Sequence, residues 1–259
     1  MRFLAALRFL TVVPIATRRE PSPEEVGGSV TYFPLVGLIV GITLAALYWL
    51  LSQILPASIA SGLAIVALVL LTGALHLDGF IDTCDGLAGN KSSEARWQVM
   101  RDSRVGAFGV VGGVLLLLLK YVSLNSLPRD LVPATLVVMP VVSRWLMAYA
   151  IVAYPYARPT GLGTIFKQHA TWEKFGLATL FALLLIGVVM WWRGIPHFYV
   201  ATLVVMAGVW LAAVGWAQHL NRKFAGLTGD SYGAVNEFSE VAVLVVISLF
   251  AFNHWLWVA

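Results

Sequence analysis

Three aspartates stand close together in the sequence, directly after a long apolar stretch. The segment HLDGFIDTCDG, residues 76–86, contains Asp78, Asp82 and Asp85. If one helix runs through these positions, their spacing of four and three residues places the three carboxylates on one face. Carboxylates so close repel one another unless a cation binds, and ligands that are all oxygen favour Mg²⁺, Ca²⁺ or Mn²⁺ over Zn²⁺. We therefore predict a divalent metal site rather than a solvated helix end.

Two further side chains of this segment, His76 and Cys84, are of types that can act as bases or metal ligands. His76 has two interpretations: a base or hydrogen-bond donor at the metal site, or a boundary histidine bonded to a backbone carbonyl. The lone cysteine, Cys84, has no other cysteine or suitably spaced histidine with which to bind a metal. We expect it to be a packing residue.

A second acidic group occurs in GLTGDSYGAVNEFSE, residues 226–240, which contains Asp230, Glu237 and Glu240. Their spacing of seven and three residues also allows a shared helical face. Glu240 begins an apolar span, where a free carboxylate is costly and usually functional. The glycines and hydroxyl residues around Gly229 suit a loop that wraps a polar ligand. Two carboxylate groups on one membrane face could hold paired metals that clamp a displacement at phosphorus.

Basic residues suited to phosphate follow in MRDSRVGAFG, residues 100–109. Arg101 and Arg104 share a helical face, with Asp102 between them, and arginine binds phosphate oxygens through two parallel hydrogen bonds. The alternative is that these arginines only anchor a cytoplasmic loop.

Three other cations are candidates. Arg144 lies about ten residues inside an apolar span, so it must pair with a carboxylate or line a polar cavity. Arg158 and Lys167 lie in YPYARPTGLGTIFK, residues 154–167, a glycine- and proline-rich segment that could close over a substrate.

The elements that position these residues must be membrane helices. The chain has 259 residues, of which 59% are hydrophobic and 12% charged, whereas soluble domains carry about 25% charged residues. Apolar stretches of about 18 or more residues recur, each long enough to cross a bilayer. We predict one all-α integral membrane domain over residues 1–259, with an amphipathic interfacial helix at the N-terminus rather than a signal peptide. The seven predicted spans lie near 32–51, 59–77, 106–124, 132–152, 175–192, 197–216 and 239–257.

The distribution of basic residues predicts the orientation. Three long polar connections, 78–105, 153–174 and 217–238, lie on one side of the membrane because they alternate with short ones. With the N-terminus, that side collects thirteen of the 17 basic residues, against Lys120, Arg129 and Arg193 on the other. The positive-inside rule makes the long loops cytoplasmic. The net charge of +4, without any basic run, fits contact with anionic lipid and excludes a nucleic-acid binder.

Five motifs, taken together and in order, resemble the cobalamin synthase family, whose members are adenosylcobinamide-GDP ribazoletransferases. The resemblance extends along essentially the whole chain, although the first 30 residues and the last span are generic. The motifs are FPLVGLIVG (33–41), LTGALHLDGFIDTCDG (71–86), MRDSRVGAFG (100–109), SRW (143–145) and GLTGDSYGAVNEFSE (226–240).

The resemblance implies a Mg²⁺-dependent reaction at the cytoplasmic face of the inner membrane. Adenosylcobinamide-GDP and α-ribazole, or its 5′-phosphate, give adenosylcobalamin, or its 5′-phosphate, and GMP. It also admits a homo-oligomer and association with other cobalamin-assembly enzymes. The role of the protein in such a transfer is chiefly to position the reactants and neutralise charge.

The residues can be given roles in that reaction. We expect Asp78, Asp82 and Asp85 to hold Mg²⁺ on the diphosphate. The second acidic group would bind another metal or orient the nucleophile, and either it or His76 would act as a base. Arg101, Arg104 and Arg144 would stabilise the developing charge.

Two other functions compete with this one. A membrane phosphotransferase that acts on CDP-alcohols also needs aspartates at a helix end, but DGLAGNKSSEAR lacks the later aspartate pair expected of that class. Asp102 is the only aspartate in the 44 residues after Asp85. A transporter would explain Arg144 and Glu240 as ion-pathway residues, but transporters often show inverted repeats and broken helices at the midplane.

Overall fold

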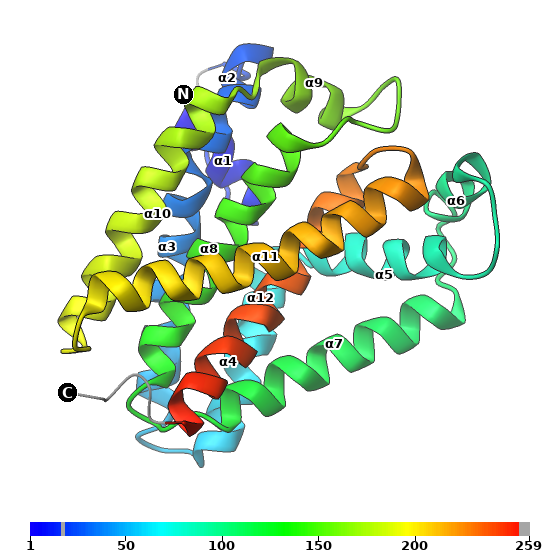
Figure 1. Cartoon of the computed structure of the whole chain (residues 1–259). Helices are drawn as coiled ribbons and strands as arrows, with labels where there is room; N and C mark the ends of the chain where they lie inside the picture. The colour runs from blue at the N-terminus through cyan, green and yellow to red at the C-terminus, as the bar shows by residue number, and fades with distance from the viewer. Residues whose placement is uncertain (17–18, 254–259) are drawn as a thin grey trace.

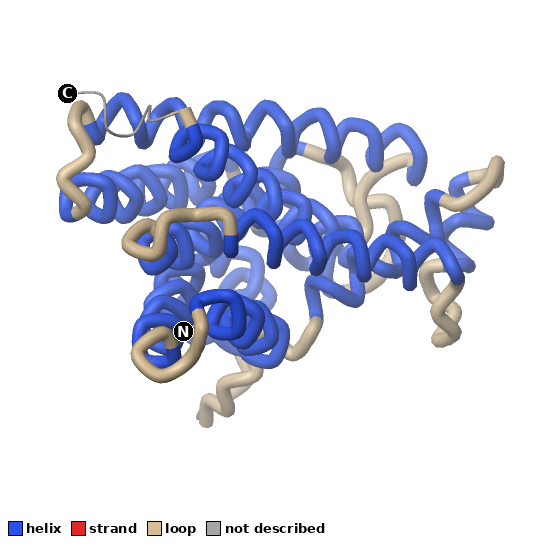
Figure 2. Tube along the Cα trace, turned by 90° about the horizontal axis from the view of Figure 1, so that it is seen from below, coloured by secondary structure: helices blue, strands red, loops and turns tan. Residues whose placement is uncertain are grey.

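The computed structural model describes residues 1–16 and 19–253, and these ranges form helices joined by short connections, with no named strand (Figures 1 and 2). The elements in chain order are α1 (Arg2–Leu10), α2 (Pro23–Gly28), η1 (Ser29–Tyr32), α3 (Phe33–Leu51), α4 (Ala57–Leu71), α5 (Leu75–Leu87), α6 (Ser93–Val99), α7 (Ala107–Asn125), α8 (Val132–Ala153), α9 (Leu162–His169), α10 (Trp172–Trp192), α11 (Phe198–Phe224) and α12 (Gly229–Phe252).

Membrane-spanning helices make up most of the chain. Within the described residues, six helices are long and apolar enough to cross a bilayer: α3 together with α2, then α7, α8, α10, α11 and α12. The bent pair α4 and α5 makes seven if it counts as one span. Apolar side chains such as Leu118 of α7 and Leu211 of α11 are more than half exposed, as expected of a lipid-facing surface. The all-α polytopic fold predicted from the sequence is confirmed.

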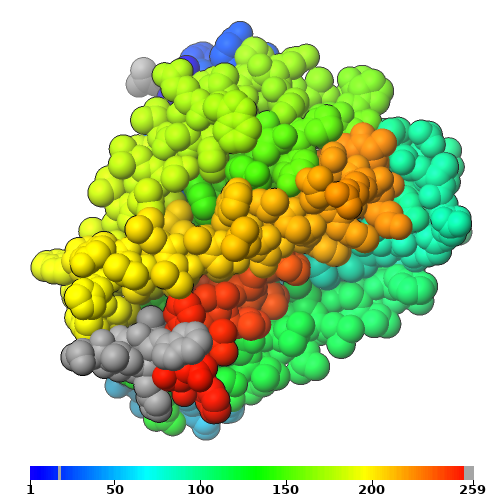
Figure 3. All heavy atoms as spheres, in the orientation of Figure 1, coloured from blue at the N-terminus to red at the C-terminus, as the bar shows by residue number. Residues whose placement is uncertain are grey.

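Helix α8 forms the centre of the bundle, and nearly all of its residues are buried. Helix α3 packs against it through glycines, because a Cβ on Gly41 would lie only 2.7 Å from the Cα of Val137. Gly37, one turn earlier, meets the backbone of Pro140 in the same way. Small residues let membrane helices approach closely, and here they fasten α3 to the core helix. Helix α11 lies across one outer face of the bundle (Figure 3).

The span predicted at 59–77 is not a single helix. Helix α4 ends at Leu71, and α5 leaves it at an angle of 89°. Gly73 and Ala74 at the bend both have left-handed backbone conformations, with φ of 60° and 57°. Glycine adopts this conformation readily, whereas alanine does so rarely. The bend places the aspartate-bearing segment in a helix of its own, beside α7 (Figure 1).

The predicted loop at 217–238 is also mostly helix. Helix α11 continues to Phe224, and α12 begins at Gly229, ten residues before the predicted span. The hydroxyl of Thr228 accepts a hydrogen bond from the backbone N–H of Ser231 at 3.1 Å, which caps the start of α12. The predicted end of this span, residues 254–257, lies outside the described residues.

The N-terminal helix is present as α1, with Ala5, Ala6 and Leu10 buried against the bundle. Its position at a membrane interface stays a prediction. Helices α1, α2 and α9 gather at one end of the molecule (Figure 1). The predicted connection 153–174 therefore contains a short helix, α9, rather than an open loop.

Candidate active site

The two acidic segments of the sequence meet where α5 crosses α12. A Cβ on Gly79 of α5 would lie 2.7 Å from the carbonyl oxygen of Asp230, and one on Gly233 of α12 would lie 3.0 Å from that of His76. The absence of side chains at both positions lets the two backbones touch. This contact brings together residues that are about 150 positions apart in the chain.

Three carboxylates lie around the crossing: those of Asp78 and Asp82 on α5 and that of Asp230 on α12. The charges of Asp78 and Asp230 both act on Asp82. Arg158 donates a hydrogen bond of 3.0 Å to Asp230, whereas the side chains of Asp78 and Asp82 have no hydrogen-bond or ion-pair partner in the described part of the chain. Like charges at short range disfavour one another, so the group is left with a negative charge that a cation would neutralise.

Asp85 has a different position and role. Its two oxygens accept hydrogen bonds from the backbone N–H groups of Gly106, at 2.7 Å, and Gly109, at 2.8 Å. These amides belong to the start of α7, so Asp85 caps that helix and complements its dipole. The glycines of GAFG are needed here because a Cβ at either position would collide with the Asp85 carboxylate. The charge of Asp85 also acts on Asp82, but its oxygens are engaged by α7, unlike those of Asp78 and Asp82.

A pocket of about 190 Å³ opens beside the crossing, between α1, α5, α8, α9 and α12. Asp78 and Asp230 line it, together with His76 and Gly229. His76 is 1% exposed, and neither of its ring nitrogens has a hydrogen-bond partner within the described residues. The interpretation of His76 as bonded to a backbone carbonyl is thus not what the structure shows.

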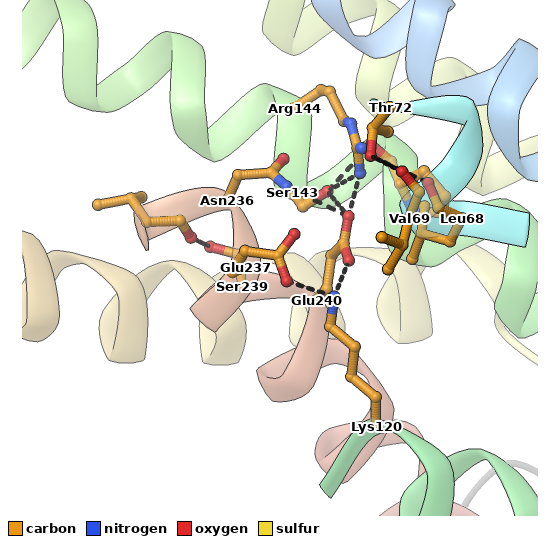
Figure 4. Close-up of polar contacts among 12 residues, drawn as sticks. Leu68, Val69, Thr72, Lys120, Ser143, Arg144, Asn236, Glu237, Ser239 and Glu240 are labelled. Carbon is orange, nitrogen blue, oxygen red and sulfur yellow. Dashed lines mark hydrogen bonds and ion pairs between the residues drawn. The ribbon is translucent and has the colours of Figure 1, made fainter. Parts of the chain in front are cut away.

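Glu237 and Glu240 are 5% and 0% exposed and so lie deeper in the bundle than Asp230, whose side chain is 26% exposed. They point towards Lys120 and Arg144 (Figure 4). Ten residues of helix place Glu240 about 15 Å further along α12. The Lys120 ammonium is 2.6 Å from Glu237 and also contacts Glu240, which in turn pairs with Arg144. Asn236 donates a further hydrogen bond to Glu240 at 3.2 Å. The second acidic group is therefore split between the crossing and this buried ion cluster.

The buried ion cluster explains two cations of the sequence. Arg144 pairs with a carboxylate, which was one of the two outcomes expected of it. Lys120, counted from the sequence among the residues of the outer side, is 1% exposed inside α7. A lysine five residues before the end of a membrane helix was the available signal, and it indicated a buried partner rather than a loop.

The other predicted cations lie in different places. Arg104 donates hydrogen bonds of 3.0 and 2.7 Å to Asp102, and this exposed pair lowers the pKa of Asp102 to about 2. Arg101 lies close enough to Tyr156, at the edge of the site, for its positive charge to lower the pKa of the Tyr156 hydroxyl. Burial raises the pKa of Tyr156. Lys167 donates to the carbonyl of Val152 at 2.7 Å, which fastens α9 to the end of α8.

Comparison with known proteins decides the family. Residues 2–248 match the model of the family described as cobalamin-5-phosphate synthase. The chain belongs to this family. No solved structure matches it.

Relatives over the whole length carry one name, adenosylcobinamide-GDP ribazoletransferase. The protein of Geotalea daltonii is 38% identical, with 95% of this chain and 96% of the relative covered. A Pseudomonas putida relative is 39% identical, with 95% of this chain and 98% of the relative covered. The Desulfitobacterium hafniense relative is 36% identical, with 93% of this chain and 93% of the relative covered. The resemblance stated from the sequence motifs is confirmed, and the cobalamin-5-phosphate synthase family places the chain among the enzymes of cobalamin synthesis.

Within this family member, the structure brings together only part of the predicted site. Asp78, Asp82, Asp230, His76 and Arg158 gather at the crossing. In the described part of the chain, no three or more histidine, cysteine, aspartate or glutamate side chains lie close enough together to hold a metal ion between them. A metal at this site stays a prediction.

Proposed function

We propose that the chain is a Mg²⁺-dependent adenosylcobinamide-GDP ribazoletransferase. It joins adenosylcobinamide-GDP to α-ribazole, or to its 5′-phosphate, and releases GMP. The observation that supports this most is the α5–α12 crossing, where Asp78 and Asp230 line a pocket and their charges act on Asp82. A reaction at a diphosphate needs cations that neutralise the phosphates, and carboxylates would hold such cations; the names of the relatives supply the substrates.

The bond changes follow from the substrates. A ribazole hydroxyl oxygen forms the new bond to the phosphorus that carries cobinamide, and the bond from that phosphorus to the oxygen of GMP breaks. The hydroxyl proton must pass to a nearby base. Asp230 lines the pocket and is the candidate, whereas the ring nitrogens of His76 are buried beside Arg144 and Glu240. Glu237 and Glu240 are unsuited because they are buried with Lys120 and Arg144 and do not line the pocket.

The carboxylates at the crossing fit magnesium by their chemistry. Mg²⁺ is usually held by one or two carboxylates, with substrate phosphates and water completing its shell. Within residues 1–16 and 19–253, the side chains of Asp78 and Asp82 have no hydrogen-bond or ion-pair partner, whereas Asp85 is engaged with α7. Bound Mg²⁺ would neutralise charge on the diphosphate.

Two arginines are placed to bind phosphate oxygens. Arg158 uses one nitrogen for Asp230, and its buried Nε has no partner among the described residues. Arg101 lies near the same edge of the site. We assign these two residues to the charge that develops on the departing GMP, rather than Arg104, which is engaged with Asp102.

We also propose that the site faces the cytoplasm from the inner membrane. The charge asymmetry of the sequence supports this orientation. With Lys120 inside the bundle, the outer side retains only Arg129 and Arg193 of its predicted cations. Self-association and contact with other cobalamin-assembly enzymes stay predictions.

The test is a transfer assay with the full-length protein in lipid nanodiscs. Adenosylcobinamide-GDP and α-ribazole are mixed with and without Mg²⁺, and GMP and the joined corrinoid are measured by chromatography. We expect Mg²⁺-dependent product that is lost in Asp82→Asn and kept in the matched control Asp130→Asn, whose carboxylate pairs with Arg193 elsewhere. Transfer from a CDP-alcohol to an acceptor alcohol with release of CMP, without corrinoid product, would refute the assignment.

A further inference from the structure

The pocket beside the crossing has walls that differ from the acidic site at its edge. Phe9 of α1, Met147 of α8 and Phe166 of α9 form apolar walls, with Leu75 and Leu162 nearby. Its volume of about 190 Å³ equals about six water molecules. One planar two-ring heterocycle fits such a space, whereas a corrin ring is far too large.

Two polar groups are buried in these walls without a partner. His76 and Tyr232 are 1% and 2% exposed, and within the described residues neither the imidazole nitrogens nor the Tyr232 hydroxyl has a hydrogen-bond partner. These nitrogens and this hydroxyl have almost no accessible surface, so they lie behind the pocket wall and do not face its open space. The apolar side chains that do line the pocket favour a flat, mostly apolar ligand.

We propose that this pocket binds the aromatic base of the acceptor nucleoside, so that its sugar points towards the acidic site. The inference rests on the proposed function, because a ribazole is a ribonucleoside of a benzimidazole. Such a base has an apolar edge that suits the walls formed by Phe9, Met147 and Phe166. Asp78 and Asp230, at the wall of the same pocket, are positioned for the sugar hydroxyls.

The guanine of the donor is the other two-ring base in the reaction, and the pocket suits it less. Guanine carries hydrogen-bonding groups around most of its edge. Against Phe9, Met147 and Phe166 these groups would be buried without partners, which disfavours binding. The apolar walls thus distinguish the two bases.

The lining offers a variant that fills the space without disturbing the fold. Gly229 lines the pocket, and a Cβ on it would meet no atom within 4 Å. Gly229→Val therefore adds bulk at the pocket. Gly208→Val in α11 is the matched control, because its Cβ also meets nothing within 4 Å and it lies outside the pocket. Leu162→Asp is a second variant, at a residue that is 48% exposed and so tolerant of change.

The experiment measures binding and kinetics separately. Binding of α-ribazole to the full-length protein in nanodiscs is titrated by calorimetry without donor or Mg²⁺, and GMP is titrated in parallel. We expect Gly229→Val and Leu162→Asp to raise the Kd for α-ribazole, and its KM, at least tenfold. The Kd for GMP and the KM for adenosylcobinamide-GDP should stay within twofold, as should all values for Gly208→Val.

Each alternative result has a distinct meaning. Loss of GMP binding in both pocket variants, with α-ribazole binding unchanged, would assign the pocket to guanine and overturn the proposal. Unchanged binding of both ligands would also overturn it, while product formation by the unmodified protein would leave the proposed function intact. Absence of any product from the unmodified protein would instead refute the proposed function, and this inference with it.

Discussion

Lys120 of α7 and Glu237 of α12 are 117 residues apart in the chain and meet inside the bundle, with 2.6 Å between the ammonium nitrogen and a carboxylate oxygen. Glu240 contacts the same ammonium and also Arg144 of α8. Two cations and two anions thus balance one another and join three membrane helices (Figure 4). This balance suits a structural cross-link better than a site that must receive a phosphate.

Removal of the Lys120 ammonium should therefore destabilise the fold. In Lys120→Met, Glu237 loses its only ion-pair partner in the described chain and Glu240 one of two. Loss of one partner of a buried pair costs about 3–5 kcal/mol. We expect a clearly lower thermal unfolding midpoint in detergent, while Lys91→Met, at an exposed loop residue, leaves it unchanged.

A second substitution distinguishes this explanation from simple loss of packing. Adding Glu237→Gln to Lys120→Met removes the uncompensated charge, so part of the lost stability should return. If Lys120→Met unfolds at the normal temperature but has no transferase activity, the ion cluster belongs to the active site instead.

Asp85 and Asp82 should give opposite results although they lie three residues apart. Asp85→Asn weakens the cap of α7 and should cost about 1–2 kcal/mol of stability. The protein that remains folded should keep most of its activity. The measurement is the unfolding midpoint together with kcat per folded molecule. An inactive but fully stable Asp85→Asn would return this residue to the metal site.

For Asp78→Asn and Asp82→Asn the expected loss is in catalysis. Each removes charge from a crowded carboxylate group, so stability should be equal or higher. Loss of an electrostatic contribution to the transition state lowers kcat about 10²–10³-fold. Titration of activity against Mg²⁺ should show a weaker apparent affinity. Undiminished activity of both variants at limiting Mg²⁺ would show that neither residue holds the metal.

The sequence predicted the spans well because a long apolar run can cross a bilayer only as a helix, in which its backbone polar groups bond to one another. It predicted that the two acidic segments lie on the same face of the membrane. It did not predict that α5 and α12 cross in direct contact. The helix predicted for Asp230, Glu237 and Glu240 is present, because α12 begins at Gly229 and contains all three residues. The seven- and ten-residue separations then become distances of about 10 and 15 Å along the axis.

Other features could not be derived from a single sequence. The bend at Gly73 and Ala74 depends on an alanine in a left-handed conformation, which no local pattern predicts. The bonds from Gly106 and Gly109 to Asp85 join segments more than 20 residues apart, and only tertiary packing brings them together. Lys120 carried a readable signal, because a lysine within an apolar helix needs a partner.

The close contact between α5 and α12 gives the last prediction. A Cβ at Gly79 would lie 2.7 Å from the Asp230 carbonyl oxygen, which is shorter than any relaxed contact, so Gly79→Ala must push α5 away from α12. Misplacement of reacting groups by about 1 Å can cost 10²-fold in rate. We expect kcat to fall at least tenfold while the protein remains folded in the membrane. Gly176→Ala in α10 is the matched control, since a Cβ there meets nothing within 4 Å. Full activity of Gly79→Ala would mean that the separation of these helices does not set the geometry of the reaction.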